Sequence, residues 1–180
     1  MTFERKVFKT LMLKGTAHWA HLTKPSTKFD PDGYWGLDLY LDSLSEKILT
    51  QLQDELQKFN LCDGCGQTKR DVKEIYKNRD DGLGNFIKIK RNCIRERSLK
   101  CDCCDQIKKD EDGYPIKERI KIDPPKVVDF QNNPWDDTIR IGNGSIVNVS
   151  CCAITWTWEM MTGIYYLLKG VQVIDLHRYG

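Results

Sequence analysis

Residues 37–42 decide the type of fold, because they read Leu-Asp-Leu-Tyr-Leu-Asp and alternate apolar with more polar side chains. A period of two is typical of a β-strand with one buried face. Ser43 and Glu46 follow at the spacing of a capping box, which predicts that a helix begins here. Its apolar side chains recur on one helical stripe, which we expect to pack on a sheet: Leu44, Ile48, Leu49, Leu52, Leu56 and Phe59.

Strands dominate the rest of the predicted structure. Residues 7–22 predict a long strand that is broken or bent at Gly15, and in residues 86–91 isoleucines alternate with basic side chains. Residues 146–158 are rich in β-branched and aromatic side chains, and residues 163–176 form the last predicted strand. Strand, strand, helix and three further strands predict a mainly β protein, a five-stranded barrel with one α-helix.

The length of 180 residues predicts one domain over residues 1–180. Two cysteine-rich, polar segments, at about 60–80 and 93–120, are expected to form an inserted lobe. No apolar run approaches the roughly 20 residues that a membrane helix needs, so we expect an intracellular protein that does not enter a membrane.

Eight cysteines are unusual for an intracellular chain, where thiols or metal ligands are expected instead of disulfides. Cys62 and Cys65 have the two-residue gap of a zinc-binding turn, and Cys101 and Cys104 repeat it. We therefore predict a structural Zn²⁺ held by these four thiolates. The alternatives are that Cys103 or Cys93 replaces one ligand, or that all the thiols are free.

Basic and aromatic side chains are interleaved in two places, although the net charge is only +2. A bound single strand needs cations for its phosphates and rings for its bases. The candidate phosphate contacts are Lys24, Lys28, Lys88, Lys90 and Arg91. The candidate stacking residues are Phe29, Trp35, Tyr40 and Trp156, with Tyr40 expected to point outward. The alternative for each tryptophan is a place in the core.

Motifs of catalysis do not occur in the sequence. It has no phosphate-binding glycine loop, no Gly-x-Ser-x-Gly elbow and no His-Glu-x-x-His. The paired aspartates at 30 and 32 and at 136 and 137 lie in turn-like sequence. We therefore expect a protein that is not an enzyme.

Several segments, taken in order, resemble tailed-phage single-stranded DNA-binding proteins. They cover roughly the first 45 and the last 60 residues, and the most specific are Lys24-Pro25-Ser26-Thr27-Lys28-Phe29 and Gly170-Val171-Gln172-Val173. The resemblance implies an oligonucleotide-binding (OB) fold that coats single strands, with Lys24, Lys28 and Phe29 in the loop near the DNA. It also implies replication proteins as partners and the host cell cytoplasm as the location. The cysteine pairs have no counterpart in the family pattern, so the zinc prediction rests on spacing alone.

The sequence is compatible with two functions. The first is sequence-tolerant binding of single-stranded DNA, which protects single strands in phage DNA replication, recombination and repair. The alternative is a zinc-ribbon module that docks proteins in a replication or transcription complex. Tighter binding to a single strand than to a duplex would separate the first from the second.

Overall fold

Strand β1 (Glu4–Ser26) is long enough to pair with two different strands of a barrel, one along each part of its length. In the computed structural model, which describes residues 4–178, β1 pairs antiparallel with β9 (Ser145–Trp158) along its first part and with β2 (Tyr34–Leu41) along its second part. Gly15 lies where both partners meet β1, and a Cβ atom there would come within 2.0 Å of the Tyr40 carbonyl oxygen. Strand β1 continues through Gly15 without a break, and the close approach explains why glycine stands here.

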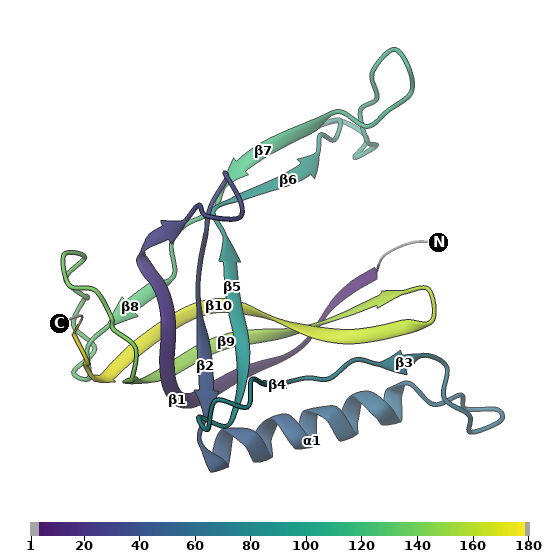
Figure 1. Cartoon of the computed structure of the whole chain (residues 1–180). Coiled ribbons are helices and arrows are strands. Elements are labelled where there is room, and N and C mark those ends of the chain that lie inside the picture. The colour runs from purple at the N-terminus through teal and green to yellow at the C-terminus, as the bar shows by residue number, and fades with distance from the viewer. Residues whose placement is uncertain (1–3, 179–180) are drawn as a thin grey trace.

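The barrel closes through a parallel contact between β5 (Asn85–Asn92) and β10 (Met161–Asp175). The sheet runs β10-β9-β1-β2-β5, and Tyr166 and Leu167 of β10 pair with Ile89 and Lys90 of β5. The remaining pairs in the ring are antiparallel. The strands of the barrel besides β1 are β2 (Tyr34–Leu41), β5 (Asn85–Asn92), β9 (Ser145–Trp158) and β10 (Met161–Asp175). The predicted mainly β, OB-type five-stranded barrel with one helix is confirmed (Figure 1).

The inner face of the barrel is filled by the side chains that alternate inward along each strand. Leu37 and Leu39 of β2 face Ile87 and Ile89 of β5, and all four are buried. Val147 and Val149 extend this core on β9, and Leu168 extends it on β10. The alternation that the sequence displays is therefore the alternation between core and outer surface.

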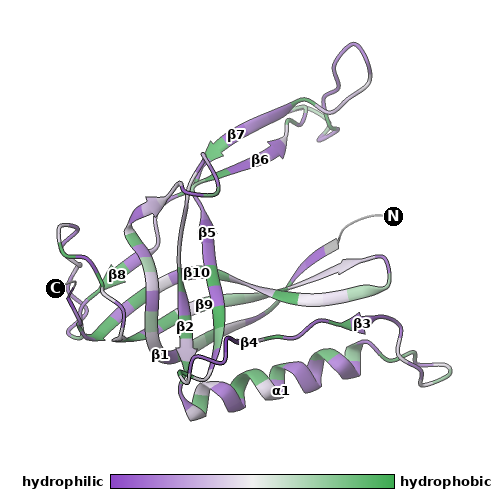
Figure 2. Cartoon of the chain, viewed as in Figure 1, coloured by the Kyte–Doolittle hydropathy of each residue, from purple (hydrophilic) through white to green (hydrophobic). Residues whose placement is uncertain are grey.

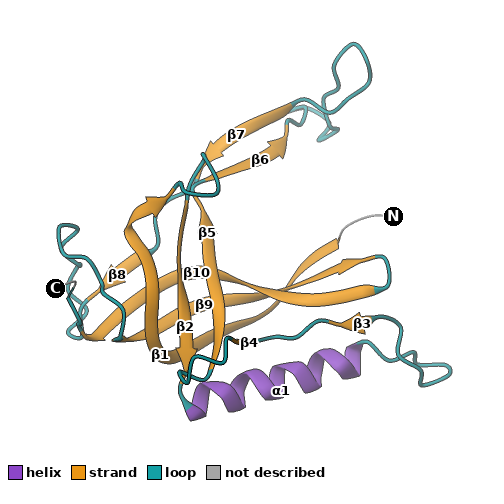
Figure 3. Ribbon diagram, viewed as in Figure 1, coloured by secondary structure: helices purple, strands orange, loops and turns teal. Residues whose placement is uncertain are grey.

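Helix α1 (Ser43–Phe59) is the one helix in the described residues and lies across one end of the barrel (Figures 1 and 3). Its N-cap is Asp42, whose carboxylate accepts a hydrogen bond from the Ser45 backbone N–H at 2.8 Å. The cap thus begins one residue before the predicted Ser43. Leu49, Leu52 and Leu56 are buried, and apolar and polar side chains alternate around the helix (Figure 2).

The two cysteine-rich segments extend from different ends of strand β5, which corrects the prediction of one shared lobe. Residues 60–84 return from the end of α1 to the start of β5 and include β3 (Asp71–Val72) and β4 (Lys77–Asn78). After the other end of β5, the chain projects as a hairpin (Figure 1). Its strands are β6 (Ile94–Ser98) and β7 (Lys117–Lys121).

A short strand, β8 (Lys126–Val128), follows the hairpin and pairs in parallel with β10. It begins directly after the Pro124–Pro125 pair. Among the described residues, no helix has both the length and the apolar character of a membrane span.

Candidate nucleic-acid interface

The outer face of β1, β2 and β5 carries the polar half of the strand alternation. Lys88 and Lys90 point outward from β5, between the buried Ile87 and Ile89. The register places Lys88 opposite Asp38 and Lys90 opposite Gly36 of β2. The ladder thus fixes the spacing of these side chains on one surface.

An open groove of about 450 Å³ runs over this face. The loop after β1 forms one wall, and Gly36 lies on the floor, where a Cβ atom would come within 2.6 Å of the Ile89 carbonyl oxygen. Most of the other lining side chains are aromatic, basic or acidic, and the full set besides Gly36 is Trp19, His21, Ser26, Lys28, Phe29, Asp30, Tyr34, Leu37, Asp38, Arg79, Lys88 and Lys90. Four of the predicted DNA-binding residues, Lys28, Phe29, Lys88 and Lys90, are brought together here.

Trp19 is a groove residue that the sequence did not single out. The pairing of β1 with β2 shifts register between His18 and His21, and Trp19 lies in this bulge with a φ of 52°. Its backbone N–H donates to Oδ1 of Asn143 at 2.8 Å, and its side chain is 59% exposed. A left-handed backbone costs a bulky residue about 1–3 kcal/mol, so the surroundings must hold it, as they commonly do at functional sites. The bulge turns the ring out of the strand alternation and toward the groove.

The other two groove rings lie beside cations. Phe29 is 80% exposed, and Lys28 Nζ is 5.2 Å from its ring centroid. Tyr34 is half-buried, and Lys90 Nζ is 4.3 Å from its ring centroid. A positive charge next to an accessible ring can meet the phosphate and the base of one nucleotide together.

Asp38 organises the charges at the end of the groove next to Arg79. Its nearly buried carboxylate accepts from the Arg79 guanidinium at 2.7 Å, and Lys88 Nζ is 3.8 Å away. The hydrogen bond to Asp38 is the main reason that the pKa of Arg79 is raised above its usual value. Two cations thus share one buried carboxylate, and the groove keeps an excess of positive charge.

Tyr40 points to the outer face but is covered, so the prediction of an exposed stacking ring is wrong. Its side chain is 5% exposed and packs between His18 and Phe86, with ring centroids 4.7 and 5.1 Å away. The hydroxyl donates to Asp81 at 2.8 Å and accepts from Arg79 at 3.0 Å. Burial raises the pKa of Tyr40 and lowers that of His18. The segment before β5 folds over this ring, and strand periodicity could not show that.

Trp35 and Trp156 also lie away from the groove. Trp35 is 8% exposed and belongs to the core, because it alternates inward on β2. Trp156 is half-buried on β9, opposite Gly163 of β10, where a Cβ atom would come within 2.6 Å of the indole. Trp35 therefore follows the packing interpretation. Trp156 packs over Gly163 and does not line this groove, and a DNA contact by Trp156 stays a prediction.

Two of the predicted phosphate contacts also lie outside this groove. Lys24 lines a neighbouring hollow with Thr27 and Arg140. Arg91 Nε donates to the Asp123 carbonyl oxygen at 2.7 Å, at the base of the hairpin. Tyr34 and Arg79, which the sequence did not single out, take places in the groove instead.

Three thiols gather near the tip of the hairpin. The sulfur atoms of Cys101, Cys103 and Cys104 lie within 4.8 Å of one another, a group that could hold a metal ion. Hydrogen bonding, first of all with the Cys103 thiol, lowers the pKa of Cys101 to about 7, which favours the thiolate that metals bind. Cys62 and Cys65 are not part of this group, so the predicted four-cysteine site is not formed within one chain as described.

The remaining cysteines divide by burial. Cys151 is buried on β9, and desolvation raises its pKa to about 12. Backbone hydrogen bonds, first from Cys65 and then from Gly64, lower the pKa of Cys62. The thiols suited to metal binding are thus those on the two protruding segments.

Comparison with solved structures identifies the fold. The crystal structure of gp2.5, a single-stranded DNA-binding protein encoded by bacteriophage T7, matches 96% of this chain and 94% of its own, with a TM-score of 0.63 at 18% identity. The single-stranded DNA-binding protein from bacteriophage Enc34 covers 95% of this chain and 84% of its own, with a TM-score of 0.50 at 12% identity. Its C-terminal truncation covers 94% and 88%, with a TM-score of 0.52 at 11% identity.

No family model and no curated sequence matches the chain. At the identities of the phage proteins, the likeness establishes the fold. The resemblance drawn from the sequence is therefore confirmed for the architecture, a barrel of the OB type that phage single-stranded DNA-binding proteins share.

Proposed function

We propose that this protein binds single-stranded DNA in the groove over β1, β2 and β5, with little preference for sequence. The observation that carries the proposal is the convergence of three rings, Trp19, Phe29 and Tyr34, with cations on the open face of the barrel. Proteins that share the fold are named as phage single-stranded DNA-binding proteins, which supports the same role here.

The groove chemistry favours unpaired nucleotides. Every base has a face that can stack on an aromatic ring, so stacking is tolerant of sequence. In a duplex those faces are already stacked on each other and are closed to the protein. Lys28, Lys88 and Lys90 would contact phosphates, and the release of counterions would make binding weaker as salt rises.

The first test is a titration of a fluorescent single-stranded oligonucleotide and of a duplex of equal length, each at two salt concentrations. We expect tighter binding of the single strand and a steep loss of affinity at the higher salt. Equal and weak binding of both would overturn the proposal and favour the protein-docking module.

Tryptophan fluorescence provides a second readout, because Trp19 is the tryptophan that lines the groove. A single strand should quench the emission of the parent protein, and Trp19→Ala should remove most of that quenching. Trp158→Ala is the matched control, since Trp158 is also exposed but lies at the end of β9. Quenching that disappears in the control and persists in the Trp19 variant would place the DNA elsewhere.

We further propose that the metal suited to the cysteine loops is zinc in a structural role. Thiolates are the ligands that zinc prefers in closed tetrahedral sites, and the sulfur group near the hairpin tip offers up to three. Metal analysis of protein purified without added zinc should find near-stoichiometric zinc, and Cys101→Ser with Cys104→Ser should lose it. A parent protein free of zinc would end this part of the proposal.

The protein would act as a binding protein and not as an enzyme, wherever phage DNA is exposed as single strands. The cytoplasm of an infected cell is the corresponding location. Its role there would be to protect single strands during replication, recombination and repair, together with replication proteins.

A further inference from the structure

The two cysteine loops are built to the same plan. The first knuckle (residues 61–68) and the second knuckle (residues 100–107) share the pattern Cys-Asp-x-Cys-x-Gln. Each is flanked by an antiparallel bridge between its first and last residue. The residue after the last cysteine of the pair has positive φ in both, 70° at Gly66 and 59° at Asp105.

The backbone hydrogen bonds repeat as well. In the first knuckle the Cys62 N–H donates to Gln67 O, and the Gly66 N–H donates to Cys62 O, both at 2.8 Å. In the second knuckle, the corresponding donors are the Cys101 N–H to Gln106 O at 2.8 Å and the Asp105 N–H to Cys101 O at 2.9 Å. Two loops with one fold present two thiols each at one spacing, which is half of a tetrahedral zinc site.

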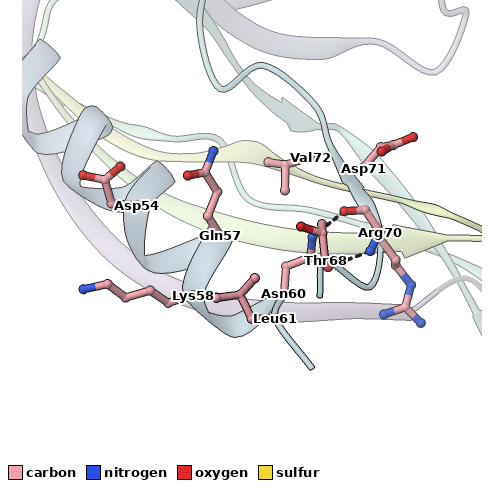
Figure 4. A pocket seen from close by; sticks show the side chains of 9 residues that line it. All are labelled: Asp54, Gln57, Lys58, Asn60, Leu61, Thr68, Arg70, Asp71 and Val72. Atoms are coloured by element: carbon pink, nitrogen blue, oxygen red, sulfur yellow. Dashed lines mark hydrogen bonds between the residues drawn. The ribbon is translucent and has the colours of Figure 1, made fainter. Parts of the chain in front are cut away.

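The first knuckle is fixed to the end of the helix. The Asn60 side chain exchanges hydrogen bonds with the backbone of Arg70, which closes the base of the loop (Figure 4). A pocket of about 570 Å³ beside it is lined by Asp54 and Lys58 of α1 and by Leu61 and Thr68 of the knuckle (Figure 4). The knuckle therefore stands in a defined position, with open space next to it.

The second knuckle is held away from the first by the base of its hairpin. The Ile122 N–H donates to Cys93 O at 2.8 Å, and the Cys93 N–H donates to Gly33 O at 3.1 Å. Arg119 of β7 forms an ion pair with Asp32 in the loop before β2. The hairpin leaves one end of β5, and the first knuckle precedes the other end, across the barrel (Figure 1). Each chain thus carries two separated half-sites.

We propose that one zinc ion joins Cys62 and Cys65 of one copy of this chain to Cys101 and Cys104 of the next copy. The proposal rests on the zinc site proposed above and names its missing ligands. Cys103 has Gly64 as its counterpart in the first knuckle, so the matched pair in each loop is the first and last cysteine.

The contact is head-to-tail, because each copy contributes a different knuckle to each of its two neighbours. Heterologous contacts of this kind generate an open row of copies unless the rotation closes a ring. A row suits a protein that covers a long single strand, where neighbouring copies bind cooperatively. The metal would thus set the contact between copies, and the barrel groove would bind the DNA.

The test begins with reduced, metal-free protein, to which Zn²⁺ alone is added while molar mass is followed by light scattering. We expect the mass to rise above that of the metal-free protein as zinc approaches about one ion per chain, and to fall again with a chelator. Uptake of zinc with no change in mass would overturn the proposal, because the site would then close within one chain.

Two knuckle variants provide the decisive arm. One carries Cys62→Ser and Cys65→Ser, and the other carries Cys101→Ser, Cys103→Ser and Cys104→Ser. Neither alone should assemble with zinc, but an equimolar mixture should form a one-to-one complex, because each supplies the knuckle that the other lacks. Co²⁺ in place of zinc should give the visible absorption of a tetrahedral thiolate site in the mixture only.

A mixture that stays unassembled, or a single variant that assembles by itself, would overturn the head-to-tail pairing. The metal-free parent and both variants should still bind a short single strand. The failure of assembly and the failure of DNA binding are thus measured separately.

Discussion

The groove and the two knuckles place their side chains by different means. The groove is formed by three neighbouring barrel strands, whose hydrogen-bonded ladders fix Lys88, Lys90 and Gly36 in register. The knuckles lie outside the barrel, on the segment after α1 and near the tip of a two-stranded hairpin. If the groove binds DNA as proposed, we expect binding to depend on the ladder of barrel strands and not on metal, and we expect changes in the knuckles to leave the groove intact.

The largest effect on DNA binding is expected from removing the three groove lysines together. Lys28→Ala with Lys88→Ala and Lys90→Ala should weaken binding of a single strand by roughly 10²–10³-fold, because charged hydrogen bonds are worth about 1.5–3 kcal/mol each and Lys88 already shares Asp38. Each lost phosphate contact lowers the slope of log affinity against log salt by about 0.7, so the slope should fall by about 2. Titrations over a range of salt measure both quantities.

The control removes the same charge from elsewhere on the surface. Lys9, Lys47 and Lys169 are exposed and do not line the groove. Their combined replacement by alanine should change the affinity far less and leave most of the salt slope. Equal losses in the two triple variants would mean that only net charge matters, and the groove would lose its special role.

The next effect is expected at the bulge. Trp19→Ala should weaken single-strand binding by about 1–3 kcal/mol, or about 5–150-fold, because the stacking ring is lost. Alanine meets the same backbone strain as tryptophan, so the bulge should persist. Trp19→Phe should recover part of the affinity. Fluorescence anisotropy measures the change, and an unaltered dissociation constant for Trp19→Ala would contradict the stacking role.

A smaller effect is expected beneath the groove, on stability. Tyr40→Phe removes the hydroxyl that joins Asp81 to Arg79, and we expect a loss of about 1 kcal/mol in the free energy of unfolding. Tyr114→Phe, on the exposed hairpin, should stay within about 0.5 kcal/mol of the parent protein. Urea unfolding of both variants gives the comparison. A large loss of DNA affinity in Tyr40→Phe with no loss of stability would instead indicate that Tyr40 contacts DNA directly.

Removal of metal is expected to have almost no effect on DNA binding in the groove. Removal of zinc by a chelator should leave the affinity for a short oligonucleotide unchanged and lower cooperativity on a long single strand. Binding to both lengths, measured with and without chelator, tests this. If the metal-free protein did not bind the short oligonucleotide, DNA binding in the groove would depend on metal in the knuckles.

The last expected outcome does not involve DNA and concerns the thiols of the metal-free protein. With a pKa of about 7, Cys101 should react with an alkylating agent near neutral pH, whereas Cys151, with a pKa of about 12, should be slow. The rate at Cys101 should fall as the pH drops below 7, because the thiolate is protonated there. Mass spectrometry of partly alkylated protein measures both sites, and equal rates would contradict the burial of Cys151.

The sequence predicted the groove in part. Lys88 and Lys90 were identified from alternation on one strand, and Lys28 and Phe29 from interleaved basic and aromatic side chains and from the family resemblance. Trp19 was not predicted, because a bulge breaks the alternation on which the inference depends. Tyr40 was misplaced because a segment distant in sequence covers it, and local periodicity carries no information about such a cover.

The order of strands, the amphipathic helix and the two matched cysteine loops were determined by the sequence alone, since period, capping and turn chemistry are local properties. The tertiary structure decided the rest. Contacts between distant segments closed β5 onto β10, turned Trp19 toward the groove through Asn143 and separated the two knuckles. Local pattern fixes which way a side chain alternates, but long-range packing fixes what that side chain meets.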